Sequence, residues 1–288
     1  MTDDNKKILR KPEWLKVRAF VGDNFNDVSS LIHEFGLDTV CQQANCPNRG
    51  ECFNRRTATF LIMGHLCTRN CRFCNIATGR PGPLDPKEPE MVAKASRRLN
   101  LRHVVVTSVT RDDLPDGGAG HFAETIRQLR KYLPDCKVEV LTPDFRGVPD
   151  ALDIVMDARP DIFNHNLETV PRLYSRVRPK ADYARSLALL RRAKEEFDAV
   201  TKSGLMVGVG EARDELREVF DNLAENHVSI LTIGQYLSPS KKHLPVQRYV
   251  SPDEFKEYAV EANRAGIKKV FSSPLVRSSY MADVVFEQ

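Results

Sequence analysis

Residues 57–75, TATFLIMGHLCTRNCRFCN, join a short apolar run to three closely spaced cysteines. The run at residues 57–63 has the length and the apolar, β-branched composition of a buried parallel strand. Cys67, Cys71 and Cys74, which we call the barrel triad, follow it as C-x3-C-x2-C. In repeated strand-helix units, functional residues lie on the loops that follow the strands. This stretch therefore predicts the first strand of a parallel sheet, with the chemistry of the protein placed at the end of that strand.

Downstream, short β-branched runs alternate with amphipathic stretches whose apolar positions recur three and four residues apart. The runs predict six strands, at residues 57–63, 103–108, 137–142, 162–166, 202–207 and 230–235. The amphipathic stretches predict helices at residues 88–99, 120–132, 183–197, 213–225 and 252–265. Such alternation is typical of an α/β fold with a parallel sheet and right-handed crossovers. Six units fit a partial (βα)6 TIM-type barrel better than an open sheet in two domains.

The barrel prediction divides the chain into three parts. Residues 57–268 form the partial barrel. Residues 1–56 precede its first strand and hold three further cysteines, so we expect an N-terminal extension wrapped onto the barrel mouth. Residues 269–288 form a C-terminal segment, which we expect to cover the same mouth.

Composition excludes several classes of protein. Of the 288 residues 41% are hydrophobic and 28% charged, unlike a disordered, collagen-like or coiled-coil chain. The longest stretch without Asp, Glu, Lys or Arg, residues 226–240, is shorter than the ~18 apolar residues that indicate a membrane span. The net charge of +4 is too small to indicate a nucleic-acid partner. The first residues lack the apolar core of a secretory signal, so we expect a cytoplasmic protein that binds neither nucleic acid nor membrane.

The cysteines carry most of the functional signal, because clustered cysteines in a reducing compartment indicate metal, cluster or redox sites rather than structural disulfides. The barrel triad supplies three thiolates, which can hold a four-iron four-sulfur cluster at three corners and leave one iron open. A structural zinc site is the alternative. It needs four ligands, and no second cysteine pair follows at the proper spacing, so we favour the cluster.

Cys41, Cys46 and Cys52 form a second set, the extension triad, with the spacing C-x4-C-x5-C. It is also one ligand short of the four that a cluster takes. Redox disulfides and a zinc knuckle are the alternatives, and two adjacent triads with different spacings resemble neither. Cys136 stands before a predicted strand, at the barrel end away from the mouth, where we expect an ordinary buried cysteine.

The C-x3-C-x2-C motif, with aromatic Phe73 before its last cysteine, resembles that of the radical SAM enzymes. The resemblance implies that the open iron binds the amino and carboxylate groups of S-adenosylmethionine (SAM). Reduction of the cluster then cleaves SAM to a 5′-deoxyadenosyl radical, which abstracts an unactivated hydrogen atom. In such enzymes the cofactor carries the radical chemistry, and the protein orients it and excludes side reactions.

The two triads, together with PLVRSSY at residues 274–280, resemble the lipoyl synthase family, and the likeness covers nearly the whole chain. Segments similar to the family include, in the same order, RRTATFLIMG, RDDLPDGGAGHFAETI, EVLTPDF, RPDIFNHNLETV, TKSGLMVGVGE and IGQYLSPSKKHLPV. The resemblance implies insertion of two sulfur atoms, at carbons 6 and 8 of an octanoyl chain amide-linked to a lysine of a carrier protein. Each carbon needs its own SAM-derived radical, and an auxiliary cluster is consumed as the sulfur source.

The resemblance also implies where that auxiliary cluster lies. In the family, the extension triad carries a second four-iron four-sulfur cluster, whose fourth ligand is a serine of RSSY. By this resemblance the ligand is Ser279, ahead of Ser278. A hard alkoxide is a poor partner for a soft cluster iron, so this bond can be given up when the cluster donates its sulfur. Without the resemblance, both serines would be interpreted as exposed hydroxyls of a C-terminal tail.

Residues near the predicted strand ends are candidate contacts to SAM or substrate, because they fall at the barrel mouth, and loop caps are the alternative. Arg185 is either a bidentate partner of the SAM carboxylate or a solvated arginine on a helix. Gly208 and Gly210 allow either the close approach of a ligand or a plain turn. The candidate cofactor contacts are Phe73, Thr107, Asn164, Asn166, Glu168, Arg185 and Gln235, with Asp112 and Tyr236 as further strand-end residues.

The implied partners are octanoylated lipoyl carrier proteins, namely the glycine cleavage H protein and the E2 subunits of 2-oxo acid dehydrogenases. A reductant such as ferredoxin or flavodoxin, and a protein that repairs the auxiliary cluster, are implied as well. Basic residues near the N-terminus either help to dock an acidic carrier domain or form a solvated tail. They are Lys6, Lys7, Arg10, Lys11, Lys16 and Arg18.

Three positions depart from the family pattern: Ser273 stands for a glycine, Ser240 for a threonine, and Met281 for a basic residue or histidine. None is a cysteine or part of RSSY, so they concern the geometry of the tail and one loop. The alternative enzyme is another radical SAM protein with an auxiliary cluster, acting on a small molecule or tRNA. A non-catalytic zinc or iron–sulfur module is the alternative from another class.

Overall fold

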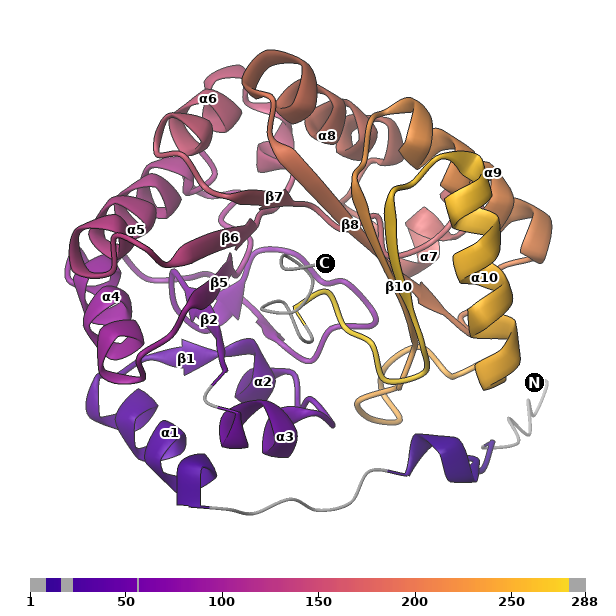
Figure 1. Cartoon of the computed structure of the whole chain (residues 1–288), viewed down its shortest axis with the longest axis horizontal. Helices are drawn as coiled ribbons and strands as arrows, with labels where there is room; N and C mark the ends of the chain where they lie inside the picture. The colour runs from indigo at the N-terminus through magenta and orange to yellow at the C-terminus, as the bar shows by residue number, and fades with distance from the viewer. Residues whose placement is uncertain (1–8, 17–22, 56, 280–288) are drawn as a thin grey trace.

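The computed structural model describes residues 9–16, 23–55 and 57–279. At its centre a sheet of eight strands, in the order β1-β2-β5-β6-β7-β8-β9-β10, curves into a partial barrel (Figure 1). Neighbouring strands from β2 to β10 are parallel, and β1 pairs with β2 antiparallel. The strands are β1 (Asp38–Thr39), β2 (Thr59–Ile62), β5 (His103–Ser108), β6 (Lys137–Leu141), β7 (Ile162–Asn164), β8 (Val200–Val207), β9 (Ile230–Gln235) and β10 (Lys269–Ser272). The predicted partial barrel is confirmed.

Helices cover the outside of the sheet (Figure 1). Each buries an apolar stripe, as α5 does with Phe122, Ile126 and Leu129. They are α4 (Glu88–Arg98), α5 (Ala119–Tyr132), α6 (Pro149–Asp157), α7 (Tyr174–Val177), α8 (Tyr183–Phe197), α9 (Arg213–Glu225) and α10 (Pro252–Ala265). All five predicted helices are present, and the structure adds α6, whose nine residues give too few repeats to separate a helix from a strand by pattern. In the described ranges, no helix is long and apolar enough to cross a bilayer.

The sheet has one more parallel strand than the sequence pattern predicts. β10 pairs with β9, although its residues fall in the predicted C-terminal segment. The run KVFS follows directly on Lys268 and is only four residues long, so its pattern is too short to identify a strand. The chain that leaves the sheet toward the mouth therefore starts at Ser273 rather than at residue 269.

The N-terminal extension adds β1 to the edge of the sheet and packs short helices beside it. Its helices are η1 (Glu13–Leu15), α1 (Asp23–Glu34), α2 (Val40–Gln43) and α3 (Arg49–Asn54). Phe53 of α3 is fully buried, with its ring centroid 5.6 Å from that of Phe25 in α1. This packing holds the segment that carries the extension triad against the first barrel strand.

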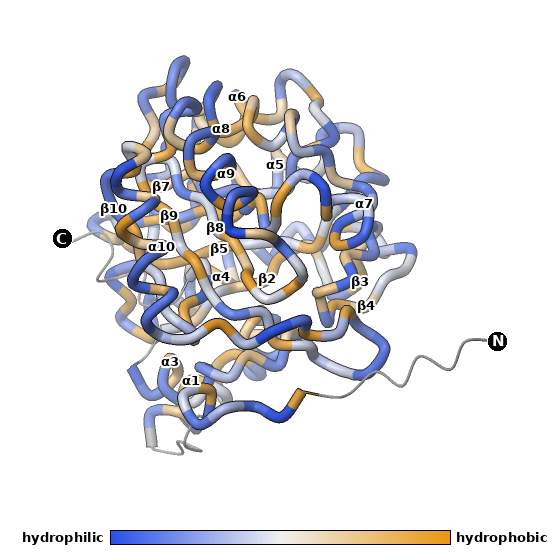
Figure 2. The backbone as a smooth tube through the Cα atoms, turned by 90° about the vertical axis from the view of Figure 1, so that its right-hand side faces the viewer, coloured by the Kyte–Doolittle hydropathy of each residue, from blue (hydrophilic) through white to orange (hydrophobic). Residues whose placement is uncertain are grey.

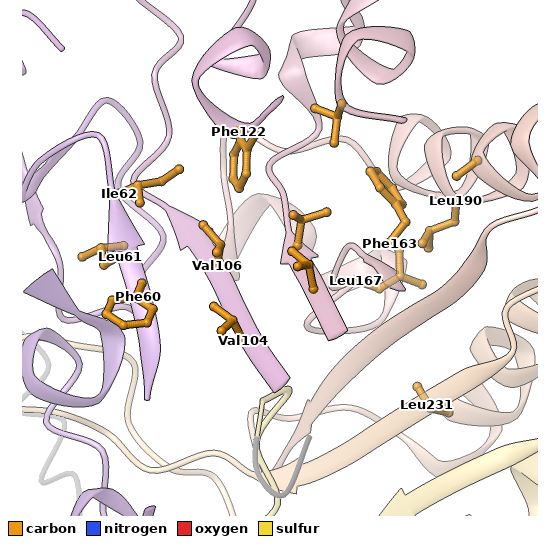
Figure 3. Close-up of a cluster of buried hydrophobic side chains, with 14 of the residues drawn as sticks. Phe60, Leu61, Ile62, Val104, Val106, Phe122, Phe163, Leu167, Leu190 and Leu231 are labelled. Atoms are coloured by element: carbon orange, nitrogen blue, oxygen red, sulfur yellow. The ribbon is translucent and has the colours of Figure 1, made fainter. Parts of the chain in front are cut away.

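The main core lies between the sheet and the outer helices. Phe60 and Ile62 of β2 and Val104 and Val106 of β5 are fully buried, in one cluster with Phe122 of α5 (Figure 3). Hydrophobic positions recur along the strands and on the helices, and hydrophilic positions are frequent on the helices and loops outside (Figure 2). This burial fixes the strands, and thereby the positions of the loops at their carboxyl ends.

The inside of the barrel holds a buried ion pair. Lys202 of β8 donates to both oxygens of Glu139 of β6 at 2.9 and 3.0 Å, and both side chains are fully buried. Asn164 of β7 donates to the same carboxylate at 2.7 Å. Burial raises the pKa of Glu139, but Lys202 and His103 outweigh it and bring that pKa down to about 2. Three neighbouring strands are thus joined by one polar network.

Candidate functional site

A cavity of about 530 Å³ lies where the loops at the carboxyl ends of the strands meet. Its walls come from the N-terminal extension, strands β2, β5, β6, β8 and β9, the segments that follow β2, β5, β6, β7 and β9, and the chain after β10. The predicted site residues that line it are Cys41, Cys46, Cys67, Cys71, Cys74, Phe73, Thr107, Asn166, Glu168, Gln235, Tyr236, Ser278 and Ser279. Folding thus brings residues from widely separated parts of the sequence into one chamber.

The barrel triad lies on a loop framed by a small sheet of β3 (Leu66–Cys67) and β4 (Ala77–Thr78). The Sγ of Cys67 accepts hydrogen bonds from the backbone N–H of Arg69 at 3.4 Å and of Thr110 at 3.2 Å. Burial is the main cause that raises the pKa of Cys71 to about 11 and that of Cys74 to about 12. Thiolates gathered here need a compensating positive charge, which bound iron would supply.

Arg69 ties the barrel triad's loop to two other loops. Its Nε and Nη2 donate to the two oxygens of Asp112 at 2.8 and 2.9 Å, and Nη2 also donates to Asp144 at 2.5 Å. Arg185 of α8 donates to the other oxygen of Asp144 at 2.8 Å. The Asp144 side chain is fully buried between the two arginines. This charge network fixes the loop in relation to the barrel.

The extension triad is gathered by α2 and α3. Burial, followed by the nearby Cys46, raises the pKa of Cys41 to about 11. Burial and the charges of Cys41 and Cys46 raise the pKa of Cys52 to about 12. Cys52 does not line the cavity, but its electrostatic coupling to the other two thiols places it beside them.

The chain after β10 crosses the mouth in contact with β9 and with the extension. A Cβ atom on Gly234 would lie 2.0 Å from the backbone oxygen of Val276, so only glycine admits this approach. Asn48, inside the extension triad's segment, donates from Nδ2 to the backbone oxygen of Leu275 at 2.7 Å. The RSSY segment is therefore held next to the extension triad, and Ser279 lines the cavity.

The two serines of RSSY differ in their surroundings. Ser278 Oγ accepts a hydrogen bond from Asn166 Nδ2 at 2.6 Å. The same Nδ2 donates to Glu168 at 3.0 Å, and burial raises the pKa of Glu168. Ser278 is thus engaged by the barrel wall.

Three predicted contacts do not line the cavity. Asn164 belongs to the network of Glu139 inside the barrel. Arg185 and Asp112 belong to the network around Arg69. Each of these side chains is hydrogen-bonded to a charged side chain of the protein, so its effect on the chamber is indirect.

Hydrogen bonds within the protein account for Gln235 and for the glycine pair Gly208 and Gly210. The amide of Gln235 donates to the backbone oxygens of residues 207, 236 and 248 and accepts from the N–H of Val250 at 2.8 Å. The backbone N–H groups of Gly208 and Gly210 donate to the carboxylate of Glu211, at 2.6 and 3.0 Å. The turn interpretation of these glycines therefore fits the structure.

Arg178 is a cavity residue that the sequence pattern does not single out. It is 8% exposed, and its Nη1 donates to the backbone oxygens of Asn166 and Leu167 at 2.6 and 3.1 Å. It follows the short helix α7 rather than a strand, so the strand-end rule does not find it. Asp144, by contrast, stands three residues after β6, and the same rule could have selected it.

The donor set fits two iron–sulfur clusters. Each triad offers three thiols, and a four-iron cluster takes one thiolate at each of three irons, so the sulfurs need not converge on one ion. Across residues 9–16, 23–55 and 57–279, no three His, Cys, Asp or Glu side chains are arranged to hold a single metal ion. Arg178 Nε and Asn166 Oδ1 are buried without a hydrogen-bond partner in that same part of the chain. Both residues line the cavity.

Residues 61–223 match the profile of the Radical SAM superfamily. A protein named lipoyl synthase from Caldanaerobacter subterraneus subsp. tengcongensis is 60% identical over 277 residues, covering 96% of this chain and 97% of that protein. A lipoyl synthase from Hahella chejuensis is 55% identical over 278 residues, covering 96% of this chain and 84% of that one.

This chain belongs to the lipoyl synthase family. It is thereby a radical SAM enzyme, and membership supports SAM as cosubstrate and a four-iron four-sulfur cluster as cofactor. Two departures from the family pattern are accommodated. Ser273, in place of glycine, has no positive φ, and the Ser240 hydroxyl lies 2.9 Å from His243 Nδ1, a contact that a threonine hydroxyl can also make. Met281 lies outside the described residues.

Two solved structures align with the fold of this chain. Streptococcus suis SuiB bound to S-adenosylmethionine aligns with a TM-score of 0.59 at 11% identity, covering 74% of this chain and 49% of that one. Methylornithine synthase (PylB) aligns with a TM-score of 0.53 at 14% identity, covering 86% of this chain and 82% of that one. At these identities the likeness concerns the fold alone.

Proposed function

We propose that the chain inserts two sulfur atoms, at carbons 6 and 8, into an octanoyl chain that is amide-linked to a lysine of a carrier protein. The observation that carries the proposal is that cysteines of both triads line one cavity together with Ser279. Full-length relatives that are named lipoyl synthase, at 60% and 55% identity, support it.

In this proposal the two triads hold two clusters with separate tasks. When bound, the clusters and SAM supply the electron, the 5′-deoxyadenosyl radical and the sulfur atoms. Cys67, Cys71 and Cys74 hold the first cluster and leave one iron for SAM. Cys41, Cys46, Cys52 and Ser279 hold the auxiliary cluster. The hydrogen bond from Asn166 to Ser278 supports Ser279 as the ligand, since it leaves Ser278 occupied.

Arg178 replaces Arg185 in this proposal as the partner of the SAM carboxylate. Arg178 lines the cavity with a buried, unsatisfied Nε, counted over the described residues, whereas Arg185 is bound to Asp144 outside the chamber. A guanidinium is a strong partner for a carboxylate in a site that excludes water. Asn166 Oδ1, also unsatisfied there, accepts from the amino group of SAM, while Phe73, Thr107, Glu168 and Gln235 form the surrounding wall.

Apolar side chains of the cavity suit the octanoyl chain. Leu61, Val109, Leu141 and Met206 lie on its wall between the polar groups. An alkyl chain gains ~0.8 kcal/mol for each CH₂ group that is removed from water. We therefore assign these side chains to exclude water and to hold the chain where carbons 6 and 8 meet the reacting groups.

The partners in this proposal are those that the chemistry requires. Octanoylated H protein and E2 subunits of 2-oxo acid dehydrogenases deliver the substrate, ferredoxin or flavodoxin supplies electrons, and a repair protein rebuilds the auxiliary cluster. The place of the reaction is the cytoplasm. Among the basic residues near the N-terminus, Lys6, Lys7 and Arg18 lie outside the described residues.

The test is anaerobic incubation of the reconstituted protein with SAM, a reductant and an octanoyl-lysyl peptide, followed by mass spectrometry. We expect a peptide that has gained two sulfur atoms, together with 5′-deoxyadenosine. Release of 5′-deoxyadenosine without sulfur transfer would contradict the proposed substrate and leave a radical SAM enzyme with another one.

A further inference from the structure

Exposed cations stand around the mouth of the cavity. Five of them, which we call the rim cations, are Lys11, Arg72, Lys180, Lys241 and Lys242. Within the described ranges, none of the five has an ion-pair partner. Lys11 itself lines the cavity.

Four of the rim cations stand on segments that are bonded to one another. Lys180 Nζ donates to the backbone oxygen of Thr68, in the barrel triad's loop, at 2.8 Å. The backbone N–H of Leu244 donates to the oxygen of Arg72 at 3.1 Å, so the segment with Lys241 and Lys242 lies along the same loop. The charges on these segments therefore lie beside the barrel triad's loop.

Some surface charges on the outer helices are paired with neighbouring charges. Arg191 bonds to Glu195 on α8 at 2.9 Å, and Lys256 bonds to Asp253 on α10 at 2.8 Å. Such pairs cancel at a distance, whereas unpaired cations around an opening attract an approaching anion. The rim cations thus form a group of positive charges beside the entrance of the chamber.

The size of the cavity limits what can enter. A volume of about 530 Å³ admits a flexible acyl-lysine arm together with a cofactor, but not a folded domain. The surface of the carrier around the modified lysine must then rest on the mouth. We propose that the rim cations recognise acidic side chains that flank the acylated lysine of the carrier, and so select the substrate. This inference rests on the proposed function.

Three octanoyl-lysine peptides of equal length test the proposal, with flanking residues that are acidic, neutral amide or basic. We expect kcat/KM to fall by about tenfold or more from the acidic to the neutral peptide, mainly through KM, and to fall further for the basic one. Raising the ionic strength should remove the preference. Fluorescence anisotropy with labelled peptides and reconstituted enzyme measures binding separately from turnover.

A matched pair of double variants locates the effect. In Lys241→Glu/Lys242→Glu the preference for the acidic peptide should vanish or reverse. Arg102→Glu/Lys268→Glu changes the charge equally, at exposed cations that precede β5 and β10 at the opposite end of the barrel, and should keep it. Production of 5′-deoxyadenosine without peptide checks that each variant holds its SAM site.

Equal kcat/KM for the three peptides, or an equal loss in both double variants, would overturn the inference while leaving the proposed function intact. Sulfur transfer to none of the peptides would instead count against the proposed function. A uridine oligonucleotide that binds the rim more tightly than the acidic peptide, and loses that binding in Lys241→Glu/Lys242→Glu, would assign the rim to nucleic acid and overturn the inference as well.

Discussion

Arg69 Nη2 lies 2.5 Å from Asp144 Oδ1, and this contact fixes the cysteine loop to the loop after β6. The two side chains are 4% and 0% exposed. Burial raises the pKa of Asp144, but Arg69 and further cations outweigh it and bring that pKa to about 2, so the carboxylate is charged at neutral pH. The position of the barrel triad therefore depends on a residue that lies far outside the cysteine motif.

Replacing Asp144 by Asn should weaken both the fold and the hold on iron. Removing one partner of a buried ion pair leaves an uncompensated charge, so the free energy of unfolding should fall by ~3–5 kcal/mol. Urea denaturation measures that loss, and the rate of iron removal by a chelator should rise. Asp153→Asn is the control, since the Asp153–Arg192 pair is partly exposed and contributes less than ~1 kcal/mol. Equal iron loss in both variants would refute the role of Asp144.

Gly234→Ala should separate sulfur insertion from SAM cleavage. The new Cβ would meet the backbone oxygen of Val276 and displace the segment that carries Ser279. A displacement of ~1 Å can cost ~100-fold in rate, so sulfur transfer should collapse while 5′-deoxyadenosine is still formed. Gly82→Ala is the control, because nothing lies within 4 Å of its Cβ position. Unchanged sulfur transfer in Gly234→Ala would show that the approach of the segment is not required.

Single cysteine variants should divide the iron content between the triads. The reconstituted native chain should hold about eight irons if both clusters are of the four-iron type. Cys67→Ala should hold about four irons and release no 5′-deoxyadenosine, whereas Cys41→Ala should hold about four and still release it. Cys136, which is buried away from the cavity, serves as the control. Iron analysis decides the matter, and full occupancy in Cys41→Ala would remove the extension triad as a ligand set.

Arg178→Gln should weaken SAM binding more than Arg185→Gln. A hydrogen bond to a charged group contributes ~1.5–3 kcal/mol, so the KM for SAM should rise about tenfold or more. Arg185 is engaged by Asp144 and is one-third exposed, so its removal should have the smaller effect. Calorimetric titration of SAM into each reconstituted variant gives the comparison, with equal iron content as the control. The reverse order of the two effects would favour Arg185 as the carboxylate partner.

The buried Glu139–Lys202 pair should make the free energy of unfolding depend on pH in the acidic range. The pKa of Glu139 in the folded chain is about 2, below the ordinary value of 4.5 for a glutamate. A group whose pKa is lowered by folding stabilises the fold above its unfolded pKa, and this contribution disappears as the pH falls through the folded value. The native chain should therefore lose up to ~3 kcal/mol of folding free energy between about pH 4.5 and pH 2.

The matched variant for this pH dependence is Glu139→Leu/Lys202→Met, which removes both charges from the barrel interior. Urea denaturation followed by circular dichroism at several pH values measures the free energy of unfolding of both proteins. The difference in acid sensitivity between them is the quantity of interest. Identical pH profiles would show that another group controls acid unfolding.

Much of the fold follows from local patterns. Short apolar runs and helical repeats are properties of neighbouring residues, so they locate the strands and helices that the structure contains. The exceptions are short elements: β10 has four residues and α6 has nine, and in such lengths tertiary packing decides what the pattern leaves open. The cysteine spacings are also local, which is why both triads were identified from the sequence.

The sequence likewise selects some residues of the candidate site and not others. Strand-end position correctly selects Asn166 and Glu168 as cavity residues, but it also selects Asn164, whose side chain points into the network of Glu139. Asn164 is the last residue of β7 and Asn166 lies two positions beyond it, so strand-end position alone does not decide which of the two side chains reaches the chamber. Arg178 was missed because it follows a short helix and is brought to the cavity by tertiary contacts.

The sequence by itself determined the barrel, the two triads and the family resemblance, because periodicity and spacing act over a few residues. The tertiary structure alone decided which distant groups meet: Arg69 with Asp144, Asn48 with the chain before RSSY, and the rim cations around one mouth. Contacts of this kind join residues that are between 75 and 227 positions apart. They depend on how strands and loops pack, since charge and hydrogen bonding act through space and not along the sequence.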